Sequence, residues 1–316
     1  MEGAAFLIHV CGKSMEIFMF RSTKALRELL KRPGPIIRPA VGDALSAKIA
    51  QEVGFDCVAV GGYALGASTG LAEPLQDMSF VTEASRRIQN VLNIPVTVDC
   101  GAGFGEAIQV WKTVQTLQQG GLAAIQIEDQ VFPKRAHYHR DYQEHTISIE
   151  HMVEKVAAAV EARTDPDFVV IARTDAMRTD GYDEAVRRGN AYAKAGADVV
   201  MVFPNTIEET RNLPRDVDAP CAYVVSHGNR VGRPVPTAAE LTDMGYKLIS
   251  YSSLTSLVIY RALTQVLTDL QQTGDARQTP EDMIAARKAL EDLIGLEHLY
   301  SIEERTTESR EYVRTA

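Results

Sequence analysis

The sequence predicts an α/β protein built as a closed (β/α)8 barrel. Short apolar runs alternate along the chain with amphipathic helical segments, which is the pattern of a parallel sheet buried on both faces. There are eight such units, which suits a closed barrel better than an open doubly wound sheet. The open sheet is also disfavoured because the glycine-rich stretch 101–105 does not have the G-x-G-x-x-G spacing of a dinucleotide-binding turn.

Each unit has the same order of elements: a helix, a glycine or turn, and an apolar run that ends in polar residues. The predicted strands lie at 36–40, 56–62, 95–99, 122–129, 168–175, 198–205, 220–226 and 245–251. The helices between them include 44–53, 106–118, 149–162 and 182–195, where apolar residues recur every three or four positions. Gly54, Gly120 and Gly196 follow three of these helices, and glycine favours the end of a helix.

The helical pattern at the C-terminal end is longer than one barrel needs. Two amphipathic stretches, 254–271 and 280–302, are joined by a Gly-Asp turn. We therefore divide the chain into an N-terminal arm (1–23), a barrel domain (24–272) and a C-terminal helical extension (273–316). The extension is expected to pack on a neighbouring subunit, although a cap that packs on its own barrel would give the same pattern.

Composition and charge exclude several classes of protein. The net charge of −9 disfavours nucleic acid as the main partner, because contact with its backbone needs a positive surface. No apolar run reaches the roughly 18 residues that span a membrane, and no basic start precedes the apolar residues near the N-terminus. The four cysteines (Cys11, Cys57, Cys100 and Cys221) form no C-x-x-C pair. A reducing, cytoplasmic location is expected.

Candidate functional residues lie where the predicted strands end, because the carboxyl ends of barrel strands form the active site. They are Gly61, Gly62, Asp99, Glu128, Asp129, Arg173, Asp175, Asn205, Ser226, His227 and Ser250 to Ser253, with Asp77 on the loop after the second strand. Several carboxylates beside one arginine suggest a hard divalent cation with an anionic ligand next to it. For any single carboxylate, a helix N-cap or a surface ion pair is the simpler explanation.

The segment after the fourth strand is too polar and basic for the core. Lys134, Arg135, His137, His139 and Arg140 make it a loop that could close over an anionic substrate. The partner implied by both features is a small carboxylic acid.

These residues and their order resemble the isocitrate lyase / phosphoenolpyruvate mutase superfamily across residues 24 to 272. The matching stretches are Asp43-Ala44-Leu45-Ser46-Ala47-Lys48, Gly61-Gly62 with Gly66, Asp99-x-Gly-x-Gly-Phe-Gly, Ile127-Glu128-Asp129-Gln130 followed by Pro133-Lys134-Arg135, and Ile171-Ala172-Arg173-Thr174-Asp175-Ala176. The resemblance implies a barrel whose last helix is swapped between subunits, usually in a tetramer of two dimers. It also implies Mg²⁺-dependent chemistry on 2-oxo or 2-hydroxy acids, with Mn²⁺ as an alternative.

The resemblance assigns a role to individual positions. Asp99 is similar to the direct metal ligand, and Asp77 and Glu128 to acceptors for metal-bound water. Gly61 and Gly62 would bind the substrate carboxylate through backbone N–H groups. Arg173 would bind the enolate oxygen or the carboxylate, and a planar guanidinium suits that task. The other predicted substrate contacts are Asn205, Ser226 and His227.

The chain departs from the lyases of this superfamily on the closing loop. Those that cleave methylisocitrate-like substrates carry a cysteine as acid or base where this chain has Ala136. Lys134 on the same loop is predicted to be catalytic. Alanine cannot transfer a proton, so another side chain must replace the cysteine, and histidine's pKa near neutrality favours His137. Tyr138 and His139 are further alternatives.

Three other positions also differ from those lyases. Asn205 stands where those lyases have a glutamate, and Ser226 where they have an asparagine, which favours a smaller substrate. Gly101 stands where they have a second aspartate, so one contact to the metal or its waters is missing. The predicted function is a Mg²⁺-dependent lyase that cleaves a C–C bond of a small 2-hydroxy or 2-oxo dicarboxylate through a pyruvate-like enolate. The alternative is a decarboxylase or hydrolase of oxaloacetate-like acids. A phosphonomutase, or a non-catalytic relative that binds a 2-oxo acid, is less favoured.

Overall fold

The computed structural model describes residues 6–10, 13–17, 21–136, 146–229 and 232–306. The chain divides into two compact units, Met1–Ser256 and Leu257–Ala316. The first unit contains the barrel and every candidate functional residue named above.

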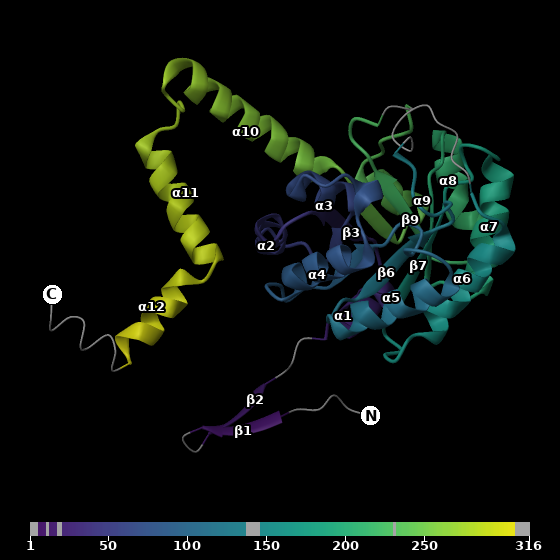
Figure 1. Ribbon diagram of the computed structural model, residues 1–316, viewed down its shortest axis with the longest axis horizontal. Helices are drawn as coiled ribbons and strands as arrows, with labels where there is room; N and C mark the ends of the chain where they lie inside the picture. The colour runs from purple at the N-terminus through teal and green to yellow at the C-terminus, as the bar shows by residue number, and fades with distance from the viewer. Residues whose placement is uncertain (1–5, 11–12, 18–20, 137–145, 230–231, 307–316) are drawn as a thin grey trace. The chain divides into compact units, whose positions relative to one another are not determined.

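Eight parallel strands close into a barrel in the order β10-β3-β4-β5-β6-β7-β8-β9 (Figure 1). They are β3 (Ile36–Val41), β4 (Val58–Val60), β5 (Val96–Asp99), β6 (Ala124–Glu128), β7 (Val169–Thr174), β8 (Val199–Val202), β9 (Cys221–Val225) and β10 (Leu248–Tyr251). Each lies within or overlaps one predicted run, so the predicted (β/α)8 barrel is confirmed. The pattern of apolar runs identified the strands because most residues of a strand that is buried on both faces are apolar.

The helices surround the barrel and cover the outer face of its sheet (Figure 1). They are α1 (Ser22–Lys31), α2 (Ala44–Glu52), α3 (Gly62–Thr69), α4 (Met78–Gln89), α5 (Ala107–Gln119), α6 (Ile149–Glu161), α7 (Tyr182–Lys194), α8 (Ile207–Asp216) and α9 (Ala238–Met244), with a short 3-10 turn η1 (Glu73–Leu75). Side-chain caps fix where several of them begin. Ser148 accepts a hydrogen bond from the backbone of His151, and Thr206 and Thr237 begin capping boxes closed by Glu209 and Glu240.

The main core lies between the outer face of the sheet and these helices. Val98, Ile125 and Val170 from three strands pack in one cluster with Leu117 and Val156 from α5 and α6, and all five are fully buried. Burial of aliphatic side chains on this scale is the main favourable contribution to folding.

A polar layer lies inside the barrel. The Arg38 side chain is buried and donates hydrogen bonds to Ser250 Oγ (2.8 Å), Gln126 Oε1 (3.2 Å) and Thr97 Oγ1. Thr97 and Gln126 lie two residues before Asp99 and Glu128 on the same strands. Since alternate residues of a strand face the same side, this layer lies directly beneath those two carboxylates.

The N-terminal segment forms elements that the sequence analysis did not predict. Strands β1 (Phe6–Val10) and β2 (Lys13–Ile17) pair antiparallel as a hairpin before α1. Apolar residues are frequent there, but they follow no helix-and-strand repeat of the barrel, so the repeat pattern did not mark the hairpin.

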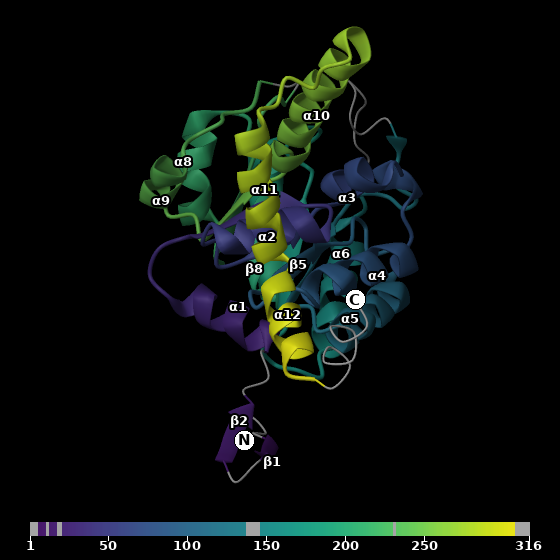
Figure 2. The same cartoon turned by 90° about the vertical axis from the view of Figure 1, so that its left-hand side faces the viewer.

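The C-terminal unit is helical (Figure 2). Helix α10 (Leu254–Thr273) leads into it, followed by α11 (Pro280–Leu293) and α12 (Leu296–Glu304). The amphipathic stretch predicted over 280–302 is helical, but it is divided between α11 and α12. Gly295 has a φ of 79°, a left-handed conformation that ends a right-handed helix, and α12 begins after it.

Candidate active site

A pocket opens where β4, β5 and β6 end. Its lining includes Gly62, Glu73, Asp99, Gly101, Phe132 and Lys134. Glu73 enters on η1, Asp99 ends β5, and Lys134 belongs to the loop that follows β6. The barrel topology therefore gathers side chains that are far apart in the sequence.

Glu128 links this pocket to Arg173. The two residues are register partners on β6 and β7, and Arg173 Nη1 lies 3.0 Å from Glu128 Oε2. Lys134 Nζ lies 3.0 Å from the other oxygen, Glu128 Oε1, and 2.7 Å from Glu73 Oε1. All four side chains are largely buried, so these charges interact with little screening by water.

Asp99 adds a further carboxylate beside this cluster. One of its oxygens accepts a hydrogen bond from the backbone N–H of Gly101 at 3.0 Å. Burial raises the pKa of Asp99, and the neighbouring Glu73 carboxylate raises it further, while the Lys134 and Arg173 charges oppose the shift. An additional positive charge at this position would therefore favour the ionised form of Asp99.

A second layer of side chains fixes Arg173. Its Nε and Nη2 both donate to Asp175 Oδ1, at 3.1 and 2.8 Å, and the other oxygen of Asp175 accepts from Gln130 at 2.8 Å. Burial raises the pKa of Asp175, and the Arg173 charge opposes that shift. The guanidinium is therefore held in one orientation before any substrate arrives.

Asp129 ties the same strand end to helix α7. Its Oδ1 accepts from the Asp175 backbone (2.9 Å), and its Oδ2 accepts from Arg188 (3.0 Å) and from the Tyr192 hydroxyl (2.7 Å). Asp129 is fully buried, and burial raises its pKa. This carboxylate faces the helix layer and has a supporting role.

The donor set fits Mg²⁺. Glu73, Asp99, Glu128 and Asp175 are four carboxylates against two cations, Lys134 and Arg173, so a divalent cation would balance the ionised cluster. Within the described residues neither Glu128 oxygen has a partner in hydrogen-bond geometry, although both are ion-paired. In the same part of the chain no three acidic, histidine or cysteine side chains converge into a metal cage. Mg²⁺ commonly binds one or two carboxylates and keeps several waters, so this arrangement still suits it.

Of the two predicted backbone binders, Gly62 lines the pocket and Gly61 lies just before it. Gly61 is the N-cap of α3, where backbone N–H groups are unsatisfied by the helix. A Cβ at Gly62 would lie 2.6 Å from Glu73 Oε1, so only glycine lets that carboxylate approach the helix.

Asp77 is the N-cap of α4 and is not among the residues that line the pocket. It is exposed, and its side chain caps the helix by accepting from the Phe80 backbone at 2.9 Å. The carboxylate from this loop that reaches the pocket is Glu73, which the sequence analysis did not name. Glu73 lies on the same loop as Asp77, between Gly62 and Asp77 in the sequence, so its position marks it as a candidate too. Sequence spacing does not show which of these two acids turns toward the pocket.

The structure does not bring the last three predicted substrate contacts into the pocket lining. Asn205 is exposed and donates to the Met177 carbonyl at 3.4 Å. The Ser226 carbonyl accepts a hydrogen bond from Asn229 Nδ2 in a turn. His227 is exposed, and its ring stacks on that of Tyr251 with the two centroids 5.9 Å apart. These three roles stay predictions.

Phe203 directly follows β8 and lies against Arg173 and Arg233. Its ring centroid lies 4.4 Å from Arg173 Cζ and 4.7 Å from Arg233 Cζ. Sequence reasoning missed both Phe203 and Arg233, because an aromatic residue ending an apolar run looks like ordinary core.

His137, Tyr138 and His139 lie outside the described residues, so the predicted replacement for the loop cysteine is not located. Ala136, the last described residue of the loop, is exposed.

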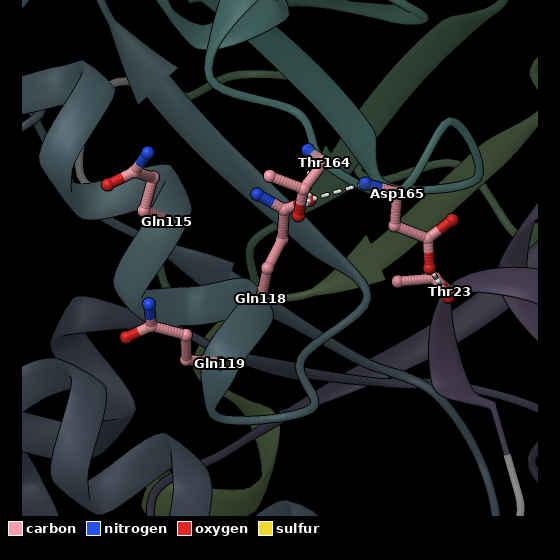
Figure 3. A pocket seen from close by; sticks show the side chains of 6 residues that line it. All are labelled: Thr23, Gln115, Gln118, Gln119, Thr164 and Asp165. Atoms are coloured by element: carbon pink, nitrogen blue, oxygen red, sulfur yellow. Dashed lines mark hydrogen bonds between the residues drawn. The ribbon is translucent and has the colours of Figure 1, made fainter.

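A second pocket lies at the opposite end of the strands (Figure 3). It is lined by Thr23, Gln115, Gln118, Gln119, Thr164 and Asp165. Gln118 Oε1 accepts from the backbones of Thr164 and Asp165, both at 3.0 Å, and Asp165 accepts from Thr23 at 2.7 Å. These bonds join α1 and α5 to the turn before β7, which indicates a structural role, since barrel active sites lie at the other end.

The fold and this cluster define a (β/α)8 barrel enzyme with a buried acid, lysine and arginine site at the carboxyl ends of its strands. The chain belongs to the phosphoenolpyruvate phosphomutase family, which matches residues 26–271. It is 34% identical over 282 residues to 2,3-dimethylmalate lyase of Eubacterium barkeri, covering 88% of this chain and 96% of that protein. It is 33% identical over 275 residues to 2-methylisocitrate lyase of Escherichia coli, covering 85% and 91%.

Solved structures agree with this assignment. A crystal structure of 2,3-dimethylmalate lyase, a member of the PEP mutase/isocitrate lyase superfamily, has a TM-score of 0.82 at 29% identity and covers 91% of this chain and 96% of that one. Oxaloacetate acetylhydrolase bound to 3,3-difluorooxalacetate has a TM-score of 0.83 at 27% identity, covering 90% and 97%. Phosphonopyruvate hydrolase with oxalate and Mg²⁺ has a TM-score of 0.78 at 29% identity, covering 90% and 98%.

The predicted superfamily, and with it an enzyme of the isocitrate lyase / phosphoenolpyruvate mutase type, is confirmed, and the relatives support a lyase. Among the helices that the structure describes, none combines the length and the apolar composition needed to cross a bilayer.

Proposed function

We propose that this protein is a Mg²⁺-dependent lyase that cleaves a C–C bond in a small 2-hydroxy or 2-oxo dicarboxylate through a pyruvate-like enolate. The observation that carries the proposal is the position of Glu128, which bridges Lys134 and Arg173 next to Asp99 at the rim of the barrel. The lyase relatives support the same reaction class.

Arg173 has the role of stabilising negative charge. When the C–C bond breaks, its electron pair moves toward a neighbouring carbonyl and negative charge gathers on an oxygen atom. Arg173 is held by Asp175 and Glu128, so its charge is already oriented and needs little reorganisation during the reaction. Backbone N–H groups of Gly61 and Gly62, at the start of α3, would bind the substrate carboxylate.

Asp99, Glu73 and Glu128 would hold the metal, with Glu73 in the place that the sequence analysis gave to Asp77. Mg²⁺, or Mn²⁺, would supply Lewis-acid stabilisation of the same developing charge. Glu73 and Glu128 are both paired with Lys134, so the charge of this lysine would offset the repulsion between the two carboxylates and orient them.

Proton transfer is assigned to the loop after β6. Lys134 is already at the cluster, and His137 remains the proposed acid or base in place of the absent cysteine. A His137→Ala variant that turns over at the parent rate would remove His137 from this role.

Hydrolysis or decarboxylation of an oxaloacetate-like acid is the second candidate function. It is supported by the likeness to oxaloacetate acetylhydrolase and by Ala136, because decarboxylation depends less on a protein acid or base. A phosphonomutase reaction and a purely binding role remain further alternatives. The paired cluster of Glu128, Lys134 and Arg173 disfavours the binding role.

One experiment separates these functions. The purified chain is incubated with Mg²⁺ and one acid at a time, which is malate, oxaloacetate or a methyl-substituted malate. Glyoxylate, pyruvate, CO₂, acetate and oxalate are measured independently. A 2-oxo acid with an equal amount of a second carboxylic acid supports the lyase. The 2-oxo acid is glyoxylate when the substrate has hydrogen on C2, as malate does, and pyruvate when C2 carries a methyl group. Pyruvate with CO₂ from oxaloacetate alone indicates decarboxylation, and oxalate with acetate indicates hydrolysis. Turnover that survives exhaustive chelation contradicts the metal requirement.

Assembly and location complete the proposal. Helices α10, α11 and α12 carry exposed large apolar residues, including Leu263, Leu267, Ile284 and Leu299, which supports a homo-oligomer with helices exchanged between subunits, as a dimer of dimers. Light scattering on the full chain tests it. The unpaired, buried Cys57, Cys100 and Cys221 support a reducing cytoplasmic location.

A further inference from the structure

The loop between β5 and α5 joins two carboxylates of the candidate active site. The Gly101 N–H donates to Asp99 Oδ1 at 3.0 Å, and the Gly101 carbonyl accepts from the Glu128 backbone N–H at 2.9 Å. A change in the position of this loop would therefore move Asp99 and Glu128 relative to each other. The pocket wall includes four residues of the loop, which are Cys100, Gly101, Ala102 and Phe104.

The backbone of this loop has a conformation that needs support. Gly101 and Gly103 have φ values of 51° and 79°, which glycine adopts without a steric penalty. Phe104 follows with a φ of 61°, in the left-handed region that is unfavourable for a bulky side chain. A residue in this region persists only where surrounding contacts determine its conformation, and such residues cluster at functional sites. Contacts from outside the loop must therefore hold it.

Lys155 supplies one of these contacts from helix α6. Its Nζ donates a hydrogen bond to the Ala102 carbonyl. The Lys155 side chain is 3% exposed and belongs to the buried stripe of α6, together with Met152, Val156 and Ala159. The other three members of this stripe are apolar, as expected for the face of a helix that packs on the core. Lys155 is the exception, and its ammonium group reaches the loop instead of solvent.

The charge of Lys155 is costly at this position. Burial lowers the pKa of Lys155, and the carboxylates of Glu106, Glu128 and Asp129 oppose that shift. A buried charge adds little net stability, because the cost of removing it from water offsets the attraction to its partners. A methionine of similar length would fill the same space without that cost. Folding alone therefore does not explain a lysine here, which indicates a role at the site.

We infer that Lys155 is a positioning residue, which fixes the loop by holding the Ala102 carbonyl. The fixed loop keeps Asp99 and Glu128 at the spacing that a divalent cation requires. This inference rests on the proposed function, in which these two carboxylates belong to the Mg²⁺ site. Lys155 contacts neither the metal nor the substrate, and it acts through the loop backbone, where Gly101 bonds to both acidic residues.

Metal binding without turnover tests the inference. The probe is Mn²⁺, because the electron paramagnetic resonance signal of the free ion is lost on binding and reports the dissociation constant without a substrate. The full chain is compared with Lys155→Met, which keeps the length of the side chain and removes the ammonium group. We expect Lys155→Met to bind Mn²⁺ about 10- to 100-fold more weakly, the loss typical of a group that supports a metal site. Its urea midpoint without metal should stay close to that of the wild type, because removing a buried charge offsets the lost hydrogen bond.

A matched control on the same helix separates positioning from folding. Val156→Ala removes apolar volume from the core next to Lys155 and is expected to lower the urea midpoint while keeping the wild-type Mn²⁺ affinity. Lys155→Gln, with a shorter and uncharged side chain, is a second test of the same loss if Lys155→Met does not fold. In turnover assays on Lys155→Met, the Mg²⁺ concentration that gives half the maximal rate should rise by the same factor. The kcat at saturating Mg²⁺ should stay largely unchanged.

Wild-type Mn²⁺ affinity in Lys155→Met would overturn the inference and leave the proposed function intact. A loss of affinity in Val156→Ala as large as that in Lys155→Met would assign Lys155 an ordinary structural role, and the inference would fail in this case too. If the wild type itself binds no Mn²⁺, the proposed metal-dependent function fails, and the inference fails with it.

Discussion

Glu128 and Arg173 are register partners on neighbouring strands of the barrel, and their side chains meet in an ion pair of 3.0 Å. The pair is almost fully buried, so neither charge is solvated enough to be stable alone. Glu128 also pairs with Lys134, and Arg173 pairs with Asp175. The site is therefore a connected network in which one substitution changes the environment of several charges.

Arg173→Lys is expected to lower kcat/KM by about 10² to 10³, because an ammonium group cannot hold Asp175 and Glu128 through a planar fork while it stabilises a developing oxyanion. Steady-state kinetics on whichever acid the product analysis identifies measures this loss. Arg187→Lys, on the exposed face of α7 where Arg187 pairs with Glu184, is the control and should keep full activity. Equal activity of both variants would contradict a charge-stabilising role for Arg173.

Glu73→Gln is expected to weaken Mg²⁺ affinity about 10- to 100-fold, the usual loss when a group supporting a metal site is changed. The physical reason is that Glu73, unlike Asp77, faces Lys134 and the pocket. Titrating activity with Mg²⁺ gives the affinity.

Asp77→Ala is the matched variant on the same loop. It is expected to keep the Mg²⁺ affinity and to reduce the free energy of unfolding by about 1 kcal/mol, because only the N-cap of α4 is lost. If Asp77→Ala loses metal affinity and Glu73→Gln does not, the original assignment of Asp77 is correct and ours is wrong.

Asp99→Asn is expected to stabilise the metal-free protein at neutral pH. The folded-state pKa of Asp99 is raised, by burial first and by Glu73 second, so the folded protein holds this proton more tightly than the unfolded chain. The stabilisation that this proton gives is fully present below the pKa of Asp99 in the unfolded chain. It is lost as the pH rises through the pKa of Asp99 in the folded protein.

The measurement is urea unfolding of both proteins with a chelator across the acidic to neutral range. The stability advantage of Asp99→Asn should grow as the pH rises and disappear in acid. Added Mg²⁺ should stabilise the wild type more than the variant. An advantage that does not vary with pH would contradict the raised pKa.

Arg38→Met is expected to reduce the free energy of unfolding by about 1 to 3 kcal/mol, because buried Thr97, Gln126 and Ser250 lose a hydrogen-bond donor. Burial lowers the pKa of Arg38, which means that the buried charge itself costs stability, and Arg38→Met removes that cost. The net loss in the free energy of unfolding is therefore smaller than the lost hydrogen bonds alone would give. Gln126→Leu should reduce the free energy of unfolding by less in the Arg38→Met variant than in the wild type. Strictly additive costs in this double-mutant cycle would show that the two side chains do not interact.

Periodicity and turn residues sufficed to predict the barrel, and the strand ends predicted three of the side chains that the structure brings together at its rim. Asp99, Glu128 and Arg173 were named because the carboxyl ends of parallel strands share one rim, a rule that needs no coordinates. The same rule could not place loop residues. Asp77 and Glu73 are four positions apart on one connection, and which of them turns inward depends on how Pro74 and η1 direct the chain.

The sequence by itself determined the eightfold strand and helix pattern and the three strand-end residues that the site is built on, because burial on both faces of a strand leaves a signature in local composition. Only the tertiary structure decided that Glu73 joins Lys134, that Asp77 caps a helix, and that Phe203 lies against both Arg173 and Arg233. Those contacts join segments far apart in the chain or depend on the direction of one loop. Their geometry is set by barrel closure and side-chain packing, which no local pattern records.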